Sequence, residues 1–194
     1  MIKISKYFQN YSVALILATL FFSCSNDIKD VRDFLADKNL PIGIAENINM
    51  VYKDSGDITT KMVSPLLYDF SNRKDNPYSE FPEGLHLTKI NKQGDSTTVD
   101  GNYAITYSQT NVSEIRKNVV IINHSQKYTL KTSQLYWDQK NHYFITEKSF
   151  VFITPTDTLQ GEGFEASENL THWHVRNNSG VLQVKDDPMS SESL

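Results

Sequence analysis

The sequence predicts an all-β domain built from antiparallel strands. The chain holds 10 Tyr and 10 Phe among 194 residues, joined by many Thr, Val and Ile, and these residue types favour strands over helices. From Ile44 onward apolar and polar residues alternate with a period of two, and turn signals follow one another at short intervals. The alternation continues with no helical period between the turns, which is typical of consecutive antiparallel strands.

The opening residues have the layout of a secretory signal peptide, predicted to cover residues 1–23. Lys3 and Lys6 precede Tyr11–Phe22, a run that is nearly all apolar. A helix over that run would span only ~18 Å, well short of a ~30 Å hydrocarbon core. The run therefore does not predict a transmembrane anchor.

The single cysteine, Cys24, follows the apolar run directly. With Ser23 before it, this segment resembles the lipobox of bacterial lipoproteins, although Phe21 stands where that pattern prefers Leu. The resemblance implies that Cys24 begins the mature chain and carries acyl groups. The alternative is an ordinary signal peptide followed by one stray thiol.

The remaining chain is long enough for one well-cored domain. Residues 24–42 form the lipidated cysteine and a polar tether, in which Val31, Phe34 and Leu35 permit a short helix. Residues 43–184 form the β-domain, and 185–194 (KDDPMSSESL) a disordered tail. Removal of the signal peptide takes the formal net charge from −4 to −6. That balance, without a Lys/Arg cluster, argues against a nucleic-acid partner.

The first predicted strand includes Met50 and Tyr52 and ends at the turn Ser55–Asp57. The second strand, Ile58–Phe70, is interrupted by Pro65, which in a sheet marks an edge or a bulge.

A polar loop over Ser71–Pro82 precedes a strand in which Leu85 and Leu87 alternate with polar neighbours. Further turns are predicted at Gln93–Asp95, Thr110-Asn111, Asn123–Gln126, Gln139–Asn141, Pro155–Asp157, Glu168-Asn169 and Asn177–Gly180. The sequences of three of the resulting hairpins can be aligned with one another at a shift of 30 residues. Either an internal repeat or the even spacing of the strands explains this alignment. Such a sheet must fold over or close to hide its apolar face.

Three segments resemble the LptC family, the anchored periplasmic subunit of the lipopolysaccharide-export bridge. Asn47–Phe70 has a strand, a Gly/Asp turn and a second strand with a Tyr-Asp-Phe close; Leu130–Trp137 (LKTSQLYW) is similar to a later family strand; Thr158–Ser167 carries a Gly-x-Gly-Phe run. The likeness extends from Asn47 to Leu182.

This resemblance implies a twisted, partly open antiparallel β-jelly roll with an apolar interior groove. Such a subunit binds the acyl chains of lipopolysaccharide received from an inner-membrane ABC extractor and passes the lipid to the next bridge subunit through sheet edges. The family likeness places the edge near Ile44–Lys53 toward the extractor. The final strands, Leu170–Arg176 and Val181–Val184, are candidates for strand addition to a partner. The best-known members use a transmembrane helix as anchor, whereas this chain is predicted to use Cys24, on the periplasmic side of the inner membrane.

A groove lined by alternate apolar side chains suits acyl chains, because each CH₂ shielded from water is worth ~0.8 kcal/mol. The candidate lining residues are Tyr103, Ile105, Tyr107, Ile121, Leu130, Leu135, Trp137, Phe144, Phe150, Phe152, Phe164 and Trp173. About half of them are expected to pack only against protein, because most would be core residues in any β-sandwich.

No enzyme, metal or cofactor is expected. The sequence has no G-x-S-x-G, H-E-x-x-H or P-loop motif. His172 and His174, with Glu165 or Glu168, offer too few defined ligands for zinc, so surface histidines are the preferred interpretation. The alternative functions are an outward-facing carbohydrate-binding or adhesive lipoprotein and a structural β-sandwich with a sealed core.

Overall fold

The computed structural model describes residues 28–178 of a chain that divides into two units, 1–34 and 35–194. Helix α2 (Ile28–Asp37) lies in the predicted tether, where the sequence permitted a short helix. Across these described residues, no helix is long and apolar enough to span a bilayer. The predicted signal peptide, the predicted acylation site at Cys24 and the predicted tail over 185–194 lie outside the described residues.

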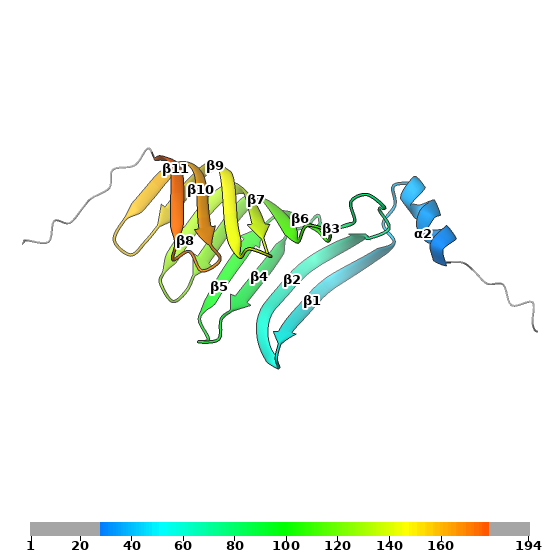
Figure 1. The fold of residues 1–194 in the computed structure, drawn as a ribbon, viewed down its shortest axis with the longest axis horizontal. Helices are drawn as coiled ribbons and strands as arrows, with labels where there is room; N and C mark the ends of the chain where they lie inside the picture. Colours follow the sequence, from blue (N-terminus) through cyan, green and yellow to red (C-terminus); the bar gives the residue numbers. More distant parts are fainter. Residues whose placement is uncertain (1–27, 179–194) are drawn as a thin grey trace, which may run out of the picture. The chain divides into compact units, whose positions relative to one another are not determined.

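The second unit contains an 11-stranded antiparallel sheet (Figure 1). Its strands are β1 (Gly43–Asp54), β2 (Asp57–Phe70), β3 (Tyr78–Phe81), β4 (Leu85–Ile90), β5 (Ser96–Gly101), β6 (Tyr103–Tyr107), β7 (Val112–Asn123), β8 (Tyr128–Asp138), β9 (Tyr143–Ile153), β10 (Thr158–Ser167) and β11 (Trp173–Asn178). The predicted all-β, antiparallel β-jelly roll is confirmed.

The sheet is a meander in which each strand pairs with its predecessor, except that β4 pairs with β2 and β6 with β3. Strand β2 pairs with β4 through Thr60–Val63 and with β3 through Tyr68–Phe70, so β3 and β4 act as two halves of one long strand. In the same way, β5 and β6 together lie along β7. Within the described residues, β1 pairs only with β2 and β11 only with β10, which leaves these two strands at the edges of the sheet.

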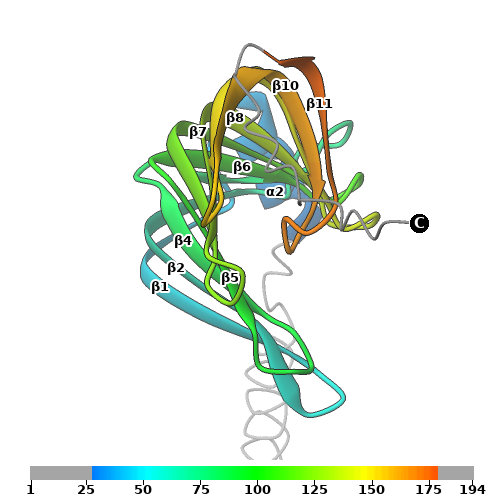
Figure 2. The same ribbon diagram turned by 90° about the vertical axis from the view of Figure 1, so that its left-hand side faces the viewer.

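The long strands bend near their middles, and the irregularities lie in neighbouring strands. The register shifts between Arg116 and Val119 in β7 and between Thr132 and Tyr136 in β8. Such bulges bend a strand and increase its twist. The bend creates two arms that face one another across an interior (Figure 2). We call them the β4–β5 arm and the β3–β6 arm, after strands that belong to one arm alone.

Polar groups stabilise the bend where regular pairing is lost. In β7, Lys117 and Asn118 have φ values of 62° and 55°, and the Lys117 carbonyl accepts a hydrogen bond from the Asn102 amide at 2.9 Å. The Ser64 hydroxyl donates to the Gly84 carbonyl at 2.7 Å. Buried backbone groups that leave the ladder thereby keep partners.

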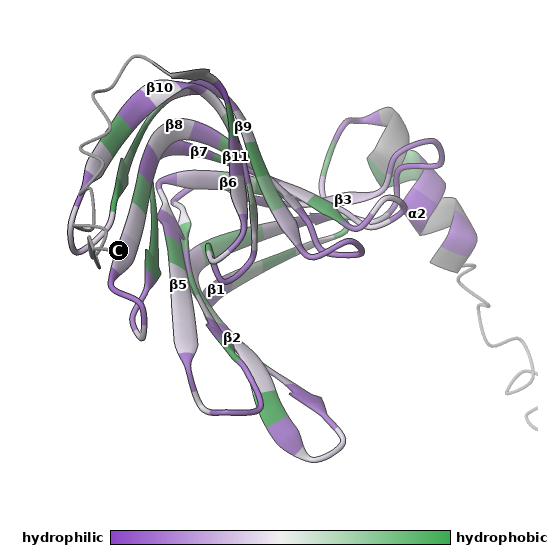
Figure 3. Ribbon diagram, turned by 60° about the vertical axis from the view of Figure 1, so that its left-hand side comes forward, coloured by the Kyte–Doolittle hydropathy of each residue, from purple (hydrophilic) through white to green (hydrophobic). Residues whose placement is uncertain are grey.

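The core lies between the arms, and apolar residues alternate with polar ones along the strands (Figure 3). One cross-strand row is apolar throughout. Its members are Met50, Met62, Leu87, Val99, Ile121, Leu130, Phe152 and Leu159, each paired with the next. Because every one comes from a different strand, the row connects the inner face of the sheet from β1 to β10.

The predicted turns between Ser55 and Asn169 are found. The predicted loop over Ser71–Pro82 is wrong in part, because Tyr78–Phe81 form β3, which pairs with β2 and β6 and buries Phe81. Other differences lie near the end of the sheet. Strand β11 begins at Trp173, three residues after the predicted start, because Leu170 is fully buried in the core. It continues through Asn178, where a turn was predicted. The predicted strand Val181–Val184 lies outside the described residues.

Candidate functional site

An apolar groove of about 430 Å³ lies between the arms at the β1–β2 end of the sheet. It is lined by Met50, Tyr52, Thr60, Met62, Leu67, Ser79, Phe81, Leu85, Leu87, Lys89, Thr106, Ser113, Ile115, Trp137 and Gln139. The two arms contribute from opposite sides, since Met62 and Leu87 come from the β4–β5 arm and Phe81 and Ile115 face them. Such a largely apolar lining with a few polar groups is typical of a ligand site.

Eight of the predicted groove residues are buried in the core. They are Ile121, Leu130, Leu135, Trp137, Phe144, Phe150, Phe152 and Phe164. Their rings fill the interior toward β10; Phe164, for example, lies 4.9 Å from Phe150 and 5.0 Å from Phe152, measured between ring centroids. Of the eight, only Trp137 lines the groove. Trp173 is 44% exposed and stacks on Phe164 at 6.2 Å.

Tyr103, Ile105 and Tyr107 lie on the outer face of β6, away from this core. Ala104, between them in the sequence, is fully buried and packs inward. The Tyr103 hydroxyl instead donates to Glu80 at 2.7 Å, and its ring lies 5.7 Å below the Arg116 guanidinium. The structure thus separates these three residues from the groove and places them in an outer aromatic and charged cluster.

Electrostatics within this outer cluster is tightly coupled. Burial acts to raise the pKa of Glu114, but hydrogen bonds from Arg116 and Gln134 outweigh it, and the pKa of Glu114 lies below its usual value. Burial, together with the hydrogen bond to Glu80, raises the pKa of Tyr103. The cluster therefore holds Glu114 as a carboxylate and Tyr103 as a neutral phenol.

Most of the residues that line the groove were not among those predicted from the sequence. Met50, Met62, Leu85 and Leu87 lie on predicted strands, but the predicted lining residues begin only at Tyr103. The signal was present in the alternation of these apolar residues with exposed ones such as Val51 and Val63.

A second cavity of about 580 Å³ has a polar lining. Lys89 and Thr60 line both this cavity and the apolar groove, which places the two side by side. The remaining lining residues are Asp54, Thr59, Ile90, Asn91, Asp95, Thr97, Asn123, Ser125, Gln126, His142, Glu168, Asn169 and Thr171. An apolar space next to a polar one suits an amphiphilic molecule.

The two histidines considered for zinc are both exposed. His172 lies in the β10–β11 loop and His174 on β11, while the Glu168 carboxylate contacts Lys89, Trp137 and His142. In residues 28–178 there is no group of three or more His, Cys, Asp or Glu side chains placed to hold a metal ion.

Fold and groove together define a β-jelly-roll protein with an interior apolar groove and, within residues 28–178, an unpaired edge at β1 and another at β11. The family model described as "Lipopolysaccharide-assembly, LptC-related" matches residues 12–184. The chain belongs to this LptC family, which confirms the resemblance found in the sequence. A comparison with curated proteins returns no match. Members of this family are components of a lipopolysaccharide transport bridge and are not enzymes. They are associated with the periplasmic side of the inner membrane.

Proposed function

We propose that the apolar groove binds the acyl chains of lipopolysaccharide during its transport. The observation that carries this proposal is the space between the arms, about 430 Å³ with apolar side chains on both sides. Each CH₂ that leaves water for such a lining contributes ~0.8 kcal/mol. Chain binding of this kind needs shape and apolar surface and no reactive group.

The location of the groove supports entry of the lipid at the β1–β2 end. There Met50 is only partly buried, and Tyr52, which also lines the groove, is 51% exposed. Toward β10, by contrast, the same row of the sheet is closed by Phe152 and Leu159, both buried. We propose that acyl chains occupy the open end first and reach the predicted positions beyond Ile121 only if the arms separate.

We further propose that the lipid is received and handed on through the two edge strands. Strand β1 exposes Ile44 and Val51 and has one neighbour within the described residues. An unpaired edge is a template for another strand, and a native protein covers or uses it. The β1 edge would meet the inner-membrane extractor, and the β11 edge would meet the next bridge subunit.

The proposed anchor is an acylated Cys24 in the inner membrane. It rests on the apolar run that ends just before Cys24 and on the small residue at Ser23. The family match begins at residue 12 and so includes this segment. Two acyl chains or more would suffice for stable attachment without a spanning helix.

Photo-crosslinking in cells tests the groove with a matched pair of neighbouring positions. Met62 lines the groove, whereas Val63, the next residue of β2, points to the outer face and is 46% exposed. A photo-reactive amino acid at Met62 is expected to capture lipopolysaccharide, and the same amino acid at Val63 is not. Capture at neither position, in a folded and anchored protein, would overturn the proposal and favour the carbohydrate-binding or structural alternatives.

A further inference from the structure

One ion pair, Lys89 with Glu168, joins the two arms at the boundary between the apolar groove and the polar cavity. The Lys89 ammonium lies 2.7 Å from Glu168 Oε2. Lys89 is at the end of β4, whereas Glu168 follows β10, 79 residues later in the chain. The pair therefore connects the β4–β5 arm to the loop that ends the opposite arm.

Glu168 gathers its partners from three parts of the fold. Its Oε1 accepts a hydrogen bond from Trp137 Nε1 at 2.5 Å, and Oε2 lies 3.2 Å from His142 Nδ1. The Lys89 ammonium lies 5.2 Å from the centroid of the Trp137 ring. One carboxylate thus neutralises the cation that faces both cavities and fixes the aromatic ring that lines the groove.

The loop that carries Glu168 packs against the interior and lines the polar cavity. Leu170 is fully buried in the core although its φ is +57°, a conformation that a leucine rarely adopts. The neighbouring Asn169 carbonyl accepts a hydrogen bond from Asn123 at 2.6 Å. The Glu168 amide also donates to the His142 carbonyl at 3.0 Å, and the Leu170 amide to the Ser167 carbonyl at 2.8 Å. The regular pairing of β10 with β9 ends before this loop, at Ser167 with Tyr143, so loop residues 168–172 can move while β10 stays paired with β9.

The positive charge of Lys89 limits which groups can take the place of the Glu168 carboxylate beside it. Among the residues that line either cavity, Lys89 is the only Lys or Arg. Two other carboxylates, those of Asp54 and Asp95, line the polar cavity together with Glu168. Asp95 accepts hydrogen bonds from Ser125 and Asn91. A mostly buried ammonium that lost its counter-ion would be strongly unfavourable, so Glu168 can leave only when another anion takes its place.

We propose that Lys89 is an anion-exchange site, at which an anionic head group, of the phosphate or carboxylate class, on an amphiphile in the apolar groove displaces Glu168. This inference rests on the proposed function of the groove. The chains lie against Met62 and Leu87, the anion binds the Lys89 ammonium, and the rest of the head group enters the polar cavity. Displacement of Glu168 frees its loop, which couples arrival of the correct lipid to opening of the interior toward β10.

The experiment compares decyl phosphate with decyl maltoside, two amphiphiles with the same chain, below their micelle-forming concentrations. Calorimetric titration of the wild-type protein should give about tenfold or more tighter binding of the phosphate, the gain expected of a charge-assisted contact. Lys89→Gln should abolish this preference and Lys89→Arg should keep it. Glu168→Gln should increase it, because the internal competitor is gone.

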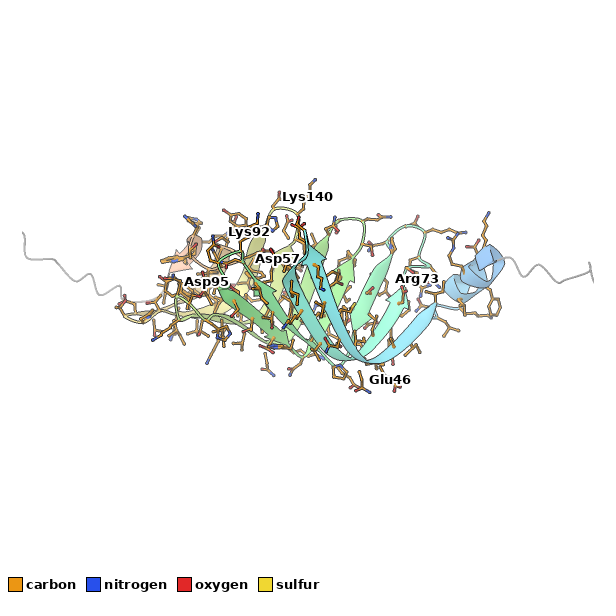
Figure 4. The ribbon with its side chains drawn as sticks, turned by 90° about the horizontal axis from the view of Figure 1, so that it is seen from below. Glu46, Asp57, Arg73, Lys92, Asp95 and Lys140 are labelled. Atoms are coloured by element: carbon orange, nitrogen blue, oxygen red, sulfur yellow. The ribbon has the colours of Figure 1, made fainter. Side chains whose placement is uncertain are left out.

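Lys92→Gln is the matched control, since Lys92 is an exposed lysine on the β4–β5 turn outside both linings (Figure 4). It should bind like wild type. A preference that survives in Lys89→Gln, in a variant with the wild-type circular dichroism spectrum, would overturn the exchange site while leaving the groove intact. So would inorganic phosphate that binds at Lys89 as tightly as decyl phosphate. Failure of both amphiphiles to bind would instead overturn the proposed function of the groove.

Discussion

Gly84 and Gly101 approach so closely at the bend that a methyl group on Gly84 would come within 2.3 Å of the Gly101 carbonyl oxygen. Gly84 is the last residue between β3 and β4, and Gly101 is the last residue of β5, just before the break to β6, so both lie where the two arms diverge. Gly84 also has a φ of +86°, in a region that L side chains rarely adopt. The bend therefore depends on the absence of side chains at this crossing.

Replacement of Gly84 by alanine should destabilise the fold strongly. The left-handed backbone costs roughly 1–2 kcal/mol, and the overlap with the Gly101 carbonyl adds about 1–3 kcal/mol. Gly94→Ala is the control, because Gly94 has the same φ of +86° but nothing within 4 Å of the added Cβ. Urea unfolding of both variants separates the two effects. Equal losses of stability would contradict a close crossing at the bend.

Met50→Asp should weaken binding of an apolar fluorescent probe in the groove by about tenfold or more. The substitution removes apolar contact equivalent to roughly two methylene groups, and at ~0.8 kcal/mol each this loss corresponds to that factor. Val51→Asp provides the control, because Val51 lies on the opposite face of the same strand and is 47% exposed. Fluorescence titration of the two folded variants measures the difference. Similar binding by both would place the probe outside the groove.

Phe152→Ala should cost about 3–5 kcal/mol of stability, the usual range for a fully buried phenylalanine. Its ring packs against Tyr128, Phe164 and Trp173. The neighbouring Val151→Ala, on the outer face, should cost about 1 kcal/mol or less. Chemical denaturation measures both. A small loss at Phe152 would mean that the interior toward β10 is open, as the sequence-based lining residues first implied.

The ion pair of Glu114 with Arg116 predicts a loss of stability in acid. Because the pKa of Glu114 is lowered in the folded protein, its contribution is complete above the pKa of the unfolded chain and is lost as the pH falls through the folded-state value. Glu114→Gln should cost about 1–3 kcal/mol at neutral pH and flatten this dependence. Thermal unfolding between neutral and acidic pH tests it, and an unchanged acid profile would contradict the assignment.

The proposed anchor predicts a change of location for Cys24→Ala. The variant lacks the thiol that receives the acyl groups, so the protein should move from the membrane fraction to the soluble periplasmic fraction. Cell fractionation with labelled fatty acid measures location and acylation together. Retention of the variant in the membrane fraction at the wild-type level would point to an attachment independent of Cys24.

The sequence predicted the fold well because two local signals agree along most of the chain. The alternation of apolar and polar residues predicts which side chains of β2 and β4 face inward. Gly, Asn and Asp residues predict turns such as Ser55-Gly56, where both residues adopt positive φ. The groove was harder to predict. In β6 the larger apolar residues face outward and the small Ala104 faces in, so hydrophobicity alone indicates the wrong face.

The bulges were a second obstacle to predicting the groove. Opposite Lys117 and Asn118 of β7, the register of β8 shifts by one residue. The inward face of β8 therefore changes from even-numbered Leu130 to odd-numbered Leu135, whereas β7 keeps one face inward. No local pattern in this segment announces that shift. The contact of Lys89 with Glu168 was also beyond sequence reasoning, since it arises only when the two arms face one another across the interior.

Successive pairing of the strands has a consequence for how the molecule is made. A chain that emerges from a translocation channel N-terminus first can add each new strand to the one just formed, and short loop closures of this kind cost little entropy. The sheet can therefore assemble during secretion, one strand after another. Contact between Lys89 and Glu168 must wait until β10 has emerged, so the interior closes only after nearly the whole sheet has formed.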